Sequence, residues 1–109
     1  MANKIERIQS LIRKNISEII QFEIKSPKLG FVSIPEVKVS TDYSHAKVYV
    51  SFFNDEEAKE GMKILNKCRG FIRKELASRM DIRHVPEITF VLDDGYKKEE
   101  RISELLSGK

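Results

Sequence analysis

The most informative part of this sequence is residues 54–80, which read NDEEAKEGMKILNKCRGFIRKELASRM. Apolar residues recur on one helical face, and the acids that follow Asn54 suit a helix start, where the helix dipole is positive. Gly70 lies between two halves that each look helical, so it is more informative than Gly61 and we expect a bend at Gly70. The apolar face consists of Ala58, Met62, Leu65, Ile72 and Leu76. This stretch therefore predicts two consecutive helices joined at a kink.

The flanking segments predict one further helix and three strands. A stripe of isoleucines predicts a helix over 3–24, which must end before Ser26-Pro27 because the residue before proline disfavours helix. Residues 31–39 and 46–53 predict strands, and their short connection predicts antiparallel pairing. Residues 87–92 predict a third strand. The order is α-β-β-α-kink-α-β, so we expect an α+β fold with a three-stranded sheet packed on helices.

Pro35 makes the first strand irregular in this prediction. It lacks an N–H, so it marks a ladder gap, a sheet edge or a bulge. Simple alternation puts Phe31, Ser33, Pro35, Val37 and Val39 on one face, and Val32, Ile34, Glu36 and Lys38 on the other.

Length and composition indicate one small domain. The chain has 109 residues, of which 40% are hydrophobic and 34% charged. We expect a domain over 1–95 and a short tail over 96–109, either helical or frayed, because Ile102, Leu105 and Leu106 have helical spacing. Cys68 is the single cysteine, so an internal disulfide is excluded. No apolar run approaches ~20 residues, and the N-terminal residues do not resemble a signal peptide, so we expect a cytoplasmic protein with no membrane partner.

The net charge of +3 hides two basic segments. Residues 1–30 carry a net +3 and residues 67–83 a net +4, whereas residues 55–66 carry −2 and residues 84–109 carry −2. Clustered Lys and Arg are typical of a protein that binds nucleic-acid phosphates, although ordinary ion pairing on helix faces also explains them. The candidate RNA-binding residues are Lys67, Arg69, Arg73 and Lys74 near the kink, Lys4, Arg7, Arg13 and Lys14 in the first helix, and Arg79 and Arg83 beside the loop into the third strand.

Several of these candidates have a structural alternative. Arg73 or Lys74 can pair with a neighbouring acid, and Arg83 can hold its loop by bonding backbone carbonyls. Tyr43 and His45 lie in the hairpin; Tyr43 can stack on a base, but we favour a role in covering the sheet edge.

We find no pattern that supports catalysis, a metal or a cofactor. The sequence has no Cys/His metal spacing, no phosphate-binding glycine loop and no recognisable pair of acids. A nucleophile pair of Cys68 with His84 is the weakest idea considered, because Cys68 lies on the apolar side of its helix and reads as a small buried residue. We therefore predict a non-enzymatic protein.

The order of elements is similar to that of K-homology RNA-binding modules, and the residues resemble one family in particular, ribosome-binding factor A. No single motif is specific, but six occur in order over almost the whole chain. The fifth motif is the strongest of the six. It consists of Gly70-Phe71-Ile72-Arg73-Lys74-Glu75-Leu76, followed by Ile82-Arg83-His84-Val85-Pro86-Glu87-Ile88-Thr89-Phe90. The others are Arg7-Ile8-Gln9-Ser10-Leu11-Ile12, Ser26-Pro27-Lys28-Leu29-Gly30-Phe31-Val32, Val37-Lys38-Val39-Ser40-Thr41-Asp42, Ala46-Lys47-Val48-Tyr49-Val50-Ser51 and Arg101-Ile102-Ser103-Glu104-Leu105-Leu106.

The resemblance implies a K-homology-like fold of the second topological type and no catalytic activity. It implies a monomer that binds the free 30S subunit rather than the 70S ribosome, and 16S rRNA during late maturation and 5′-end processing, with a role in growth at low temperature. The family's Ala-x-Gly kink is Cys68-Arg69-Gly70 here, which makes Cys68 and Gly70 the kink residues. The Gly-x-x-Gly clamp of ordinary K-homology domains is absent, so RNA binding must use other surface.

Two other classes of function stay open from the sequence. One is a generic single-stranded RNA-binding K-homology module. The other is a protein-interaction module in which the acidic turn Asp55–Glu60 docks a basic partner.

Overall fold

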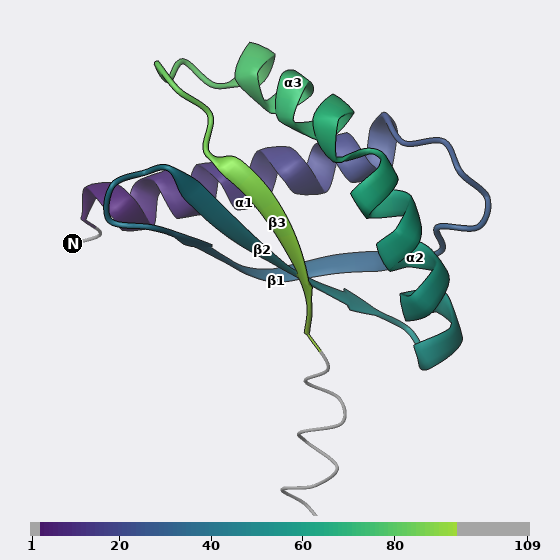
Figure 1. Ribbon diagram of the computed structural model, residues 1–109. Coiled ribbons are helices and arrows are strands. Elements are labelled where there is room, and N and C mark those ends of the chain that lie inside the picture. Colours follow the sequence, from purple (N-terminus) through teal and green to yellow (C-terminus); the bar gives the residue numbers. More distant parts are fainter. Residues whose placement is uncertain (1–2, 94–109) are drawn as a thin grey trace, which may run out of the picture.

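The computed structural model describes residues 3–93 and contains three helices and three strands in this range (Figure 1). The predicted tail over 96–109 lies outside the described residues. Within the described range, no helix is both long enough and apolar enough to span a membrane. The elements are α1 Lys4–Phe22, β1 Val32–Val39, β2 His45–Phe52, α2 Asp55–Lys67, α3 Arg69–Arg79 and β3 Glu87–Leu92. The predicted order and fold class are confirmed.

Helix α1 begins at a capping box. The Asn3 side chain accepts a 2.8 Å hydrogen bond from the backbone N–H of Glu6, and the Glu6 carboxylate accepts one of 3.3 Å from the N–H of Asn3. The isoleucine stripe is buried as the periodicity predicts, at Ile12, Ile16, Ile19 and Ile20. The helix ends at Phe22, with Glu23 as its C-cap, and so stops before Ser26-Pro27, as expected from the restriction that proline places on the preceding residue.

The sheet has the strand order β1-β2-β3. Strands β1 and β2 pair antiparallel, as predicted, with Val37 opposite Val48 and Lys38 opposite Lys47. Strand β3 pairs parallel with β2, since the α2–α3 connection carries the chain back to the same end of the sheet. Strands β1 and β3 are therefore the two edges.

The register of β1 shifts between Ser33 and Glu36, so Pro35 lies in a bulge of an edge strand. The bulge exchanges the two faces of the strand. Ile34 is buried beside Val37 and Val39, whereas Pro35 is exposed. The prediction that Phe31, Ser33 and Pro35 share a face with Val37 and Val39 is wrong, because the extra residue reverses the alternation on its N-terminal side.

The helices cover one face of the sheet, and the core lies between them (Figure 1). Gly61 of α2 lies close to Phe52 of β2, where a Cβ on Gly61 would overlap the phenyl ring. A Cβ on Gly70 would meet no heavy atom within 4 Å. Packing therefore requires glycine at position 61 but not at Gly70, the position at which we expected a bend. The fully buried side chains of the core include Leu65, Ile72, Leu76, Ile88, Val48 and Val50.

The β1–β2 hairpin is held by a carboxylate. Asp42 accepts 2.7 Å hydrogen bonds from the hydroxyls of Ser44 and Ser40, which hold the pKa of its carboxyl down at about 2. Tyr43 has a φ of 61°, in the left-handed region, and its ring packs partly against the core. Tyr43 is therefore part of the packing, whereas the cover of the sheet edge that we favoured from the sequence stays a prediction.

Candidate nucleic-acid interface

The kink between α2 and α3 is formed by Cys68, which has φ −91° and ψ 4°. Its N–H donates to the carbonyl of Ile64 across 3.0 Å, and its carbonyl accepts from the N–H of Ile72 across 2.9 Å. Cys68 thus keeps one helical hydrogen bond on each side of the bend. Gly70 lies two residues later, inside the first turn of α3, and the thiol of Cys68 is only partly buried. The predicted kink is confirmed, with its centre at Cys68.

Four basic side chains surround this kink, at Lys67, Arg69, Arg73 and Lys74, and all four are exposed. Leu65, Ile72 and Leu76 face the core, so the helix periodicity turns the basic side chains outward. Within residues 3–93, Lys67, Arg69 and Lys74 form no ion pair with an acid. These three cations are therefore available to phosphate groups.

Arg73 has a structural contact that the sequence did not reveal. Its guanidinium donates a 2.9 Å hydrogen bond to the carbonyl of Val85, in the loop before β3. The loop is held by Arg73 and not, in the part of the chain described, by Arg83, for which we considered that role. Arg83 is exposed in the same loop.

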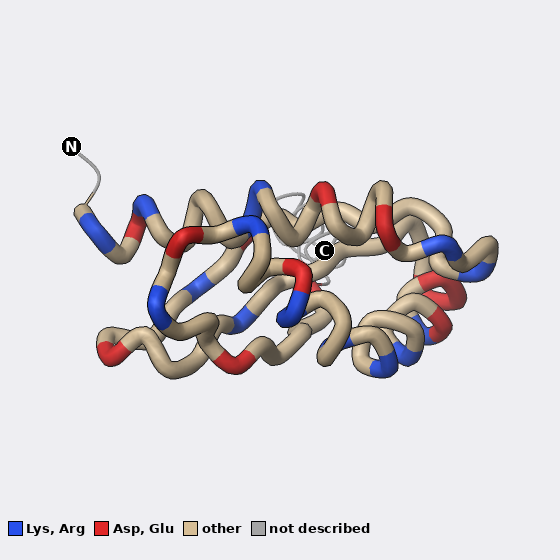
Figure 2. Tube along the Cα trace, turned by 90° about the horizontal axis from the view of Figure 1, so that it is seen from above, with Lys and Arg blue, Asp and Glu red and all other residues tan. Residues whose placement is uncertain are grey.

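The basic residues of α1 lie apart from those at the kink. Lys4 and Arg7 are at the start of α1, which lies at the opposite end of the molecule from the α2–α3 junction (Figures 1 and 2). The Nζ of Lys4 lies 5.7 Å from the ring centroid of Tyr43, a cation–π distance. The cations at the start of α1 thus do not join those at the kink.

Arg13 and Lys14 line a groove of about 430 Å³ between α1 and the first half of β1. Both are exposed, but the Nε of Arg13 donates a 2.8 Å hydrogen bond to the carbonyl of Ile34. Arg13 therefore has one donor committed to the fold, and Lys14 is the freer of the two cations.

Among the candidate RNA-binding residues, Arg79 forms ion pairs within the fold. Its guanidinium lies 3.6 Å from a carboxylate oxygen of Glu18 and 3.4 Å from one of Glu23, and these pairs join α3 to α1. We expected such pairing at Arg73 or Lys74. The acids that neutralise Arg79 are more than 50 residues away in sequence, so no local pattern indicated them.

The described residues contain no group of His, Cys, Asp and Glu that could hold a metal ion. No hydrogen bond joins Cys68 to His84 in this part of the chain, so the nucleophile pair has no geometric support. The acids at the start of α2 follow Asn54, whose side chain accepts a 2.9 Å hydrogen bond from the N–H of Glu57. This acidic turn thus has a role in starting the helix.

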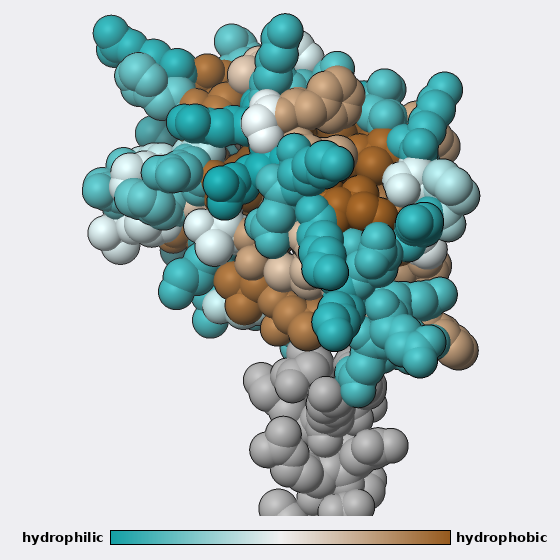
Figure 3. Space-filling model, turned by 45° about the vertical axis from the view of Figure 1, so that its right-hand side comes forward, coloured by the Kyte–Doolittle hydropathy of each residue, from teal (hydrophilic) through white to brown (hydrophobic). Residues whose placement is uncertain are grey.

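Sequence reasoning missed the exposed aromatic residues. Phe22 is the last residue of α1, Phe31 precedes β1 and Phe53 follows β2; their side chains are 61%, 70% and 79% exposed. On the side of the molecule shown in Figure 3, hydrophobic surface forms separate patches between hydrophilic side chains. A strand pattern cannot show which apolar residues are exposed, because exposure depends on whether a helix packs over them in the folded protein.

Comparison with known proteins assigns the family. The profile of ribosome-binding factor A matches residues 4–106. Ribosome-binding factor A of Halothermothrix orenii is 45% identical over 104 residues, which are 94% of this chain and 85% of the relative.

Two solved structures extend the match to the fold. The NMR structure of a candidate ribosome binding factor A from Thermotoga maritima is 36% identical, with a TM-score of 0.69 over 87% of this chain and 94% of that one. Coordinates of Thermus thermophilus ribosome binding factor A, fitted into a cryo-EM map of its complex with the 30S subunit, are 26% identical, with a TM-score of 0.66 over 76% of this chain and 88% of that one. This chain belongs to the ribosome-binding factor A family.

Proposed function

We propose that this protein is a non-enzymatic assembly factor that binds the 30S subunit and contacts 16S rRNA during late maturation and 5′-end processing. It acts in the cytoplasm as a monomer, on the free 30S subunit rather than the 70S ribosome, and it supports growth at low temperature. The observation that carries the proposal is family membership, together with a relative whose coordinates were fitted into a 30S complex.

The kink supplies the surface for this function. Lys67, Arg69 and Lys74 are exposed cations without an acidic partner in residues 3–93, which is what phosphate neutralisation requires. The bent pair of helices holds these side chains on a rigid support, because Ile72 and Leu76 are fully buried beneath them. Docking is thus electrostatic, and the fold supplies the shape.

The generic single-stranded RNA module is the second candidate among nucleic-acid binders. The segment around the kink carries no second glycine at the spacing of the Gly-x-x-Gly clamp, since Lys67 and Arg73 occupy those positions. Competition between 30S particles and random oligonucleotides separates the two functions, because an assembly factor prefers the folded particle.

The proposed function is tested by 30S binding across a salt series. The variant Arg69→Ala/Lys74→Ala removes two of the kink cations, and Lys59→Ala/Lys63→Ala removes the same charge from the exposed side of α2. We expect the first variant to lower the slope of log K against log salt by about one to two units, and the second to leave it unchanged. Equal salt slopes for both variants and the wild type would remove the kink from the interface.

A further inference from the structure

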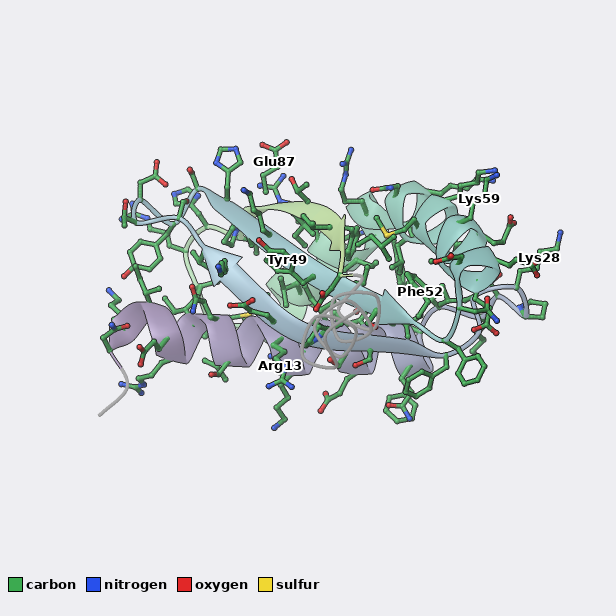
Figure 4. The ribbon with its side chains drawn as sticks, turned by 90° about the horizontal axis from the view of Figure 1, so that it is seen from below. Arg13, Lys28, Tyr49, Phe52, Lys59 and Glu87 are labelled. Carbon is green, nitrogen blue, oxygen red and sulfur yellow. The ribbon has the colours of Figure 1, made fainter. Side chains whose placement is uncertain are left out.

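One face of the sheet has no helix over it in residues 3–93. The helices pack on the face that carries Val48, Val50 and Phe52, and the alternate residues of β2 point to the other side. Figure 4 looks onto this second face, with the strands in front of α1 and Tyr49 near the middle of β2. We call it the open face; it carries Glu36, Lys38, His45, Lys47, Tyr49, Ser51, Phe53, Glu87, Thr89 and Val91, none of which is buried.

Aromatic side chains form one half of the open face. Tyr49 lies on the central strand, and Phe53 follows β2 in the same alternation and is 79% exposed. Phe31 precedes Val32, which pairs with Phe52, so Phe31 lies at the same end of the sheet as Phe53; it is 70% exposed. Exposed phenylalanines gathered at one place indicate a binding surface, and their π faces can stack on bases.

Two ammonium groups form the other half. Lys38 and Lys47 are direct partners in the β1–β2 register, and like charges directly opposite one another destabilise a sheet. Glu36 lies 3.9 Å from Lys38 and offsets one charge, whereas Lys47 has no acidic partner in residues 3–93. At the adjacent end of the sheet, His45 and Glu87 lie 3.5 Å apart and face each other. Lys47 is therefore the cation of this pair that an anionic ligand could neutralise.

The two halves are continuous. The Nζ of Lys38 lies 5.9 Å from the centroid of the Tyr49 ring, so a cation adjoins the first aromatic platform. From Lys47 to Phe53 the strand direction covers ~20 Å, which is the scale of a short single-stranded segment. Sheets that bind single-stranded RNA use this combination of stacking aromatics and nearby cations.

We propose that the open face binds a short single-stranded segment of RNA. Bases stack on Tyr49, Phe53 and Phe31, and phosphates lie beside Lys38 and Lys47. This surface is separate from the kink cations and adds a second RNA contact to the proposed function.

The experiment measures binding of an eight-nucleotide uridine oligomer to the full chain. Backbone amide NMR locates the contact, and titrations at several salt concentrations give the affinity and its salt slope. We expect chemical shift changes in residues 45–53 and 87–92 rather than around residues 67–74. Phe53→Ser should weaken binding at least about fivefold, through the loss of one base–aromatic stack. This variant lies outside β2 at an exposed position, so it tests stacking without a folding defect.

The charge contribution has its own pair of variants. Lys38→Ala/Lys47→Ala should lower the salt slope by about one unit or more, whereas the matched control Lys59→Ala/Lys63→Ala on α2 should not change it. Shifts confined to the kink, or Phe53→Ser and Lys38→Ala/Lys47→Ala variants that bind like the wild type, would overturn the open face as an RNA surface. Loss of 30S binding in Arg69→Ala/Lys74→Ala tests the kink alone, so the two proposals fail separately.

Discussion

The Nε of Arg13 donates a hydrogen bond to the carbonyl oxygen of Ile34, across 2.8 Å and between residues 21 positions apart. One turn earlier, Gln9 accepts a 2.9 Å hydrogen bond from the backbone N–H of Val39. Helix α1 thus satisfies backbone groups of the edge strand β1 on both sides of its bulge, which protects an edge that would otherwise be open to pairing. A residue that sequence alone assigns to RNA binding is also part of the fold.

This contact predicts that Arg13 contributes to stability beyond its charge. Arg13→Lys keeps the positive charge but cannot reproduce the Nε donor, so we expect a loss of about 1 kcal/mol in the free energy of unfolding. Lys14→Ala, an exposed neighbour, should change it by less than about 0.5 kcal/mol. Urea unfolding measures both, and an Arg13→Lys protein as stable as the wild type would show that the bond adds nothing.

The two helical glycines of residues 54–80 predict opposite effects on replacement by alanine. Gly61→Ala puts a methyl group into the Phe52 ring and should destabilise the fold by about 1–3 kcal/mol. Gly70→Ala meets open space in a helix and should stabilise it by about 0.5–1 kcal/mol. Thermal unfolding of the two variants is the measurement, and a destabilised Gly70→Ala would show that the kink itself needs glycine.

Asp42 predicts an acid-sensitive hairpin. Its pKa is lowered from 3.8 to about 2 by the hydroxyls of Ser44 and Ser40. Because the carboxyl has a lower pKa in the folded than in the unfolded protein, it stabilises the fold when the pH is above its unfolded-state pKa. This stabilisation is lost as the pH falls from about 4 towards 2. The stability of wild-type protein should therefore decrease more steeply over this window than that of Asp42→Asn. Parallel stability curves would contradict the shifted pKa.

The Arg79 ion pairs predict a small, salt-dependent contribution to the packing of α3 on α1. The guanidinium and its two carboxylates are all partly exposed, so Arg79→Ala should cost about 0.5 kcal/mol at low salt and less at high salt. Unfolding at two ionic strengths tests this, with Lys74→Ala as the control that lacks an ion pair. A cost that does not change with salt would mean that Arg79 acts through packing instead.

The sequence predicted the helices and strands reliably, but it predicted the contacts between them poorly. The isoleucine stripe of α1, the kink near Gly70 and the third strand at 87–92 all follow from local periodicity and breakers, and the structure places them within about two residues. Local patterns also located the basic residues at the kink. They did not separate Arg79 from Lys74, because the pairing of Arg79 with Glu23 spans 56 positions.

By itself, then, the sequence determined the order of elements, the core side of each helix and the presence of two basic segments, because each depends on residues close together in the chain. Only the tertiary structure decided which side of β1 is buried before the bulge and why Gly61 must be glycine. These properties depend on which distant residue lies opposite each position, and packing between layers, not local periodicity, sets that choice.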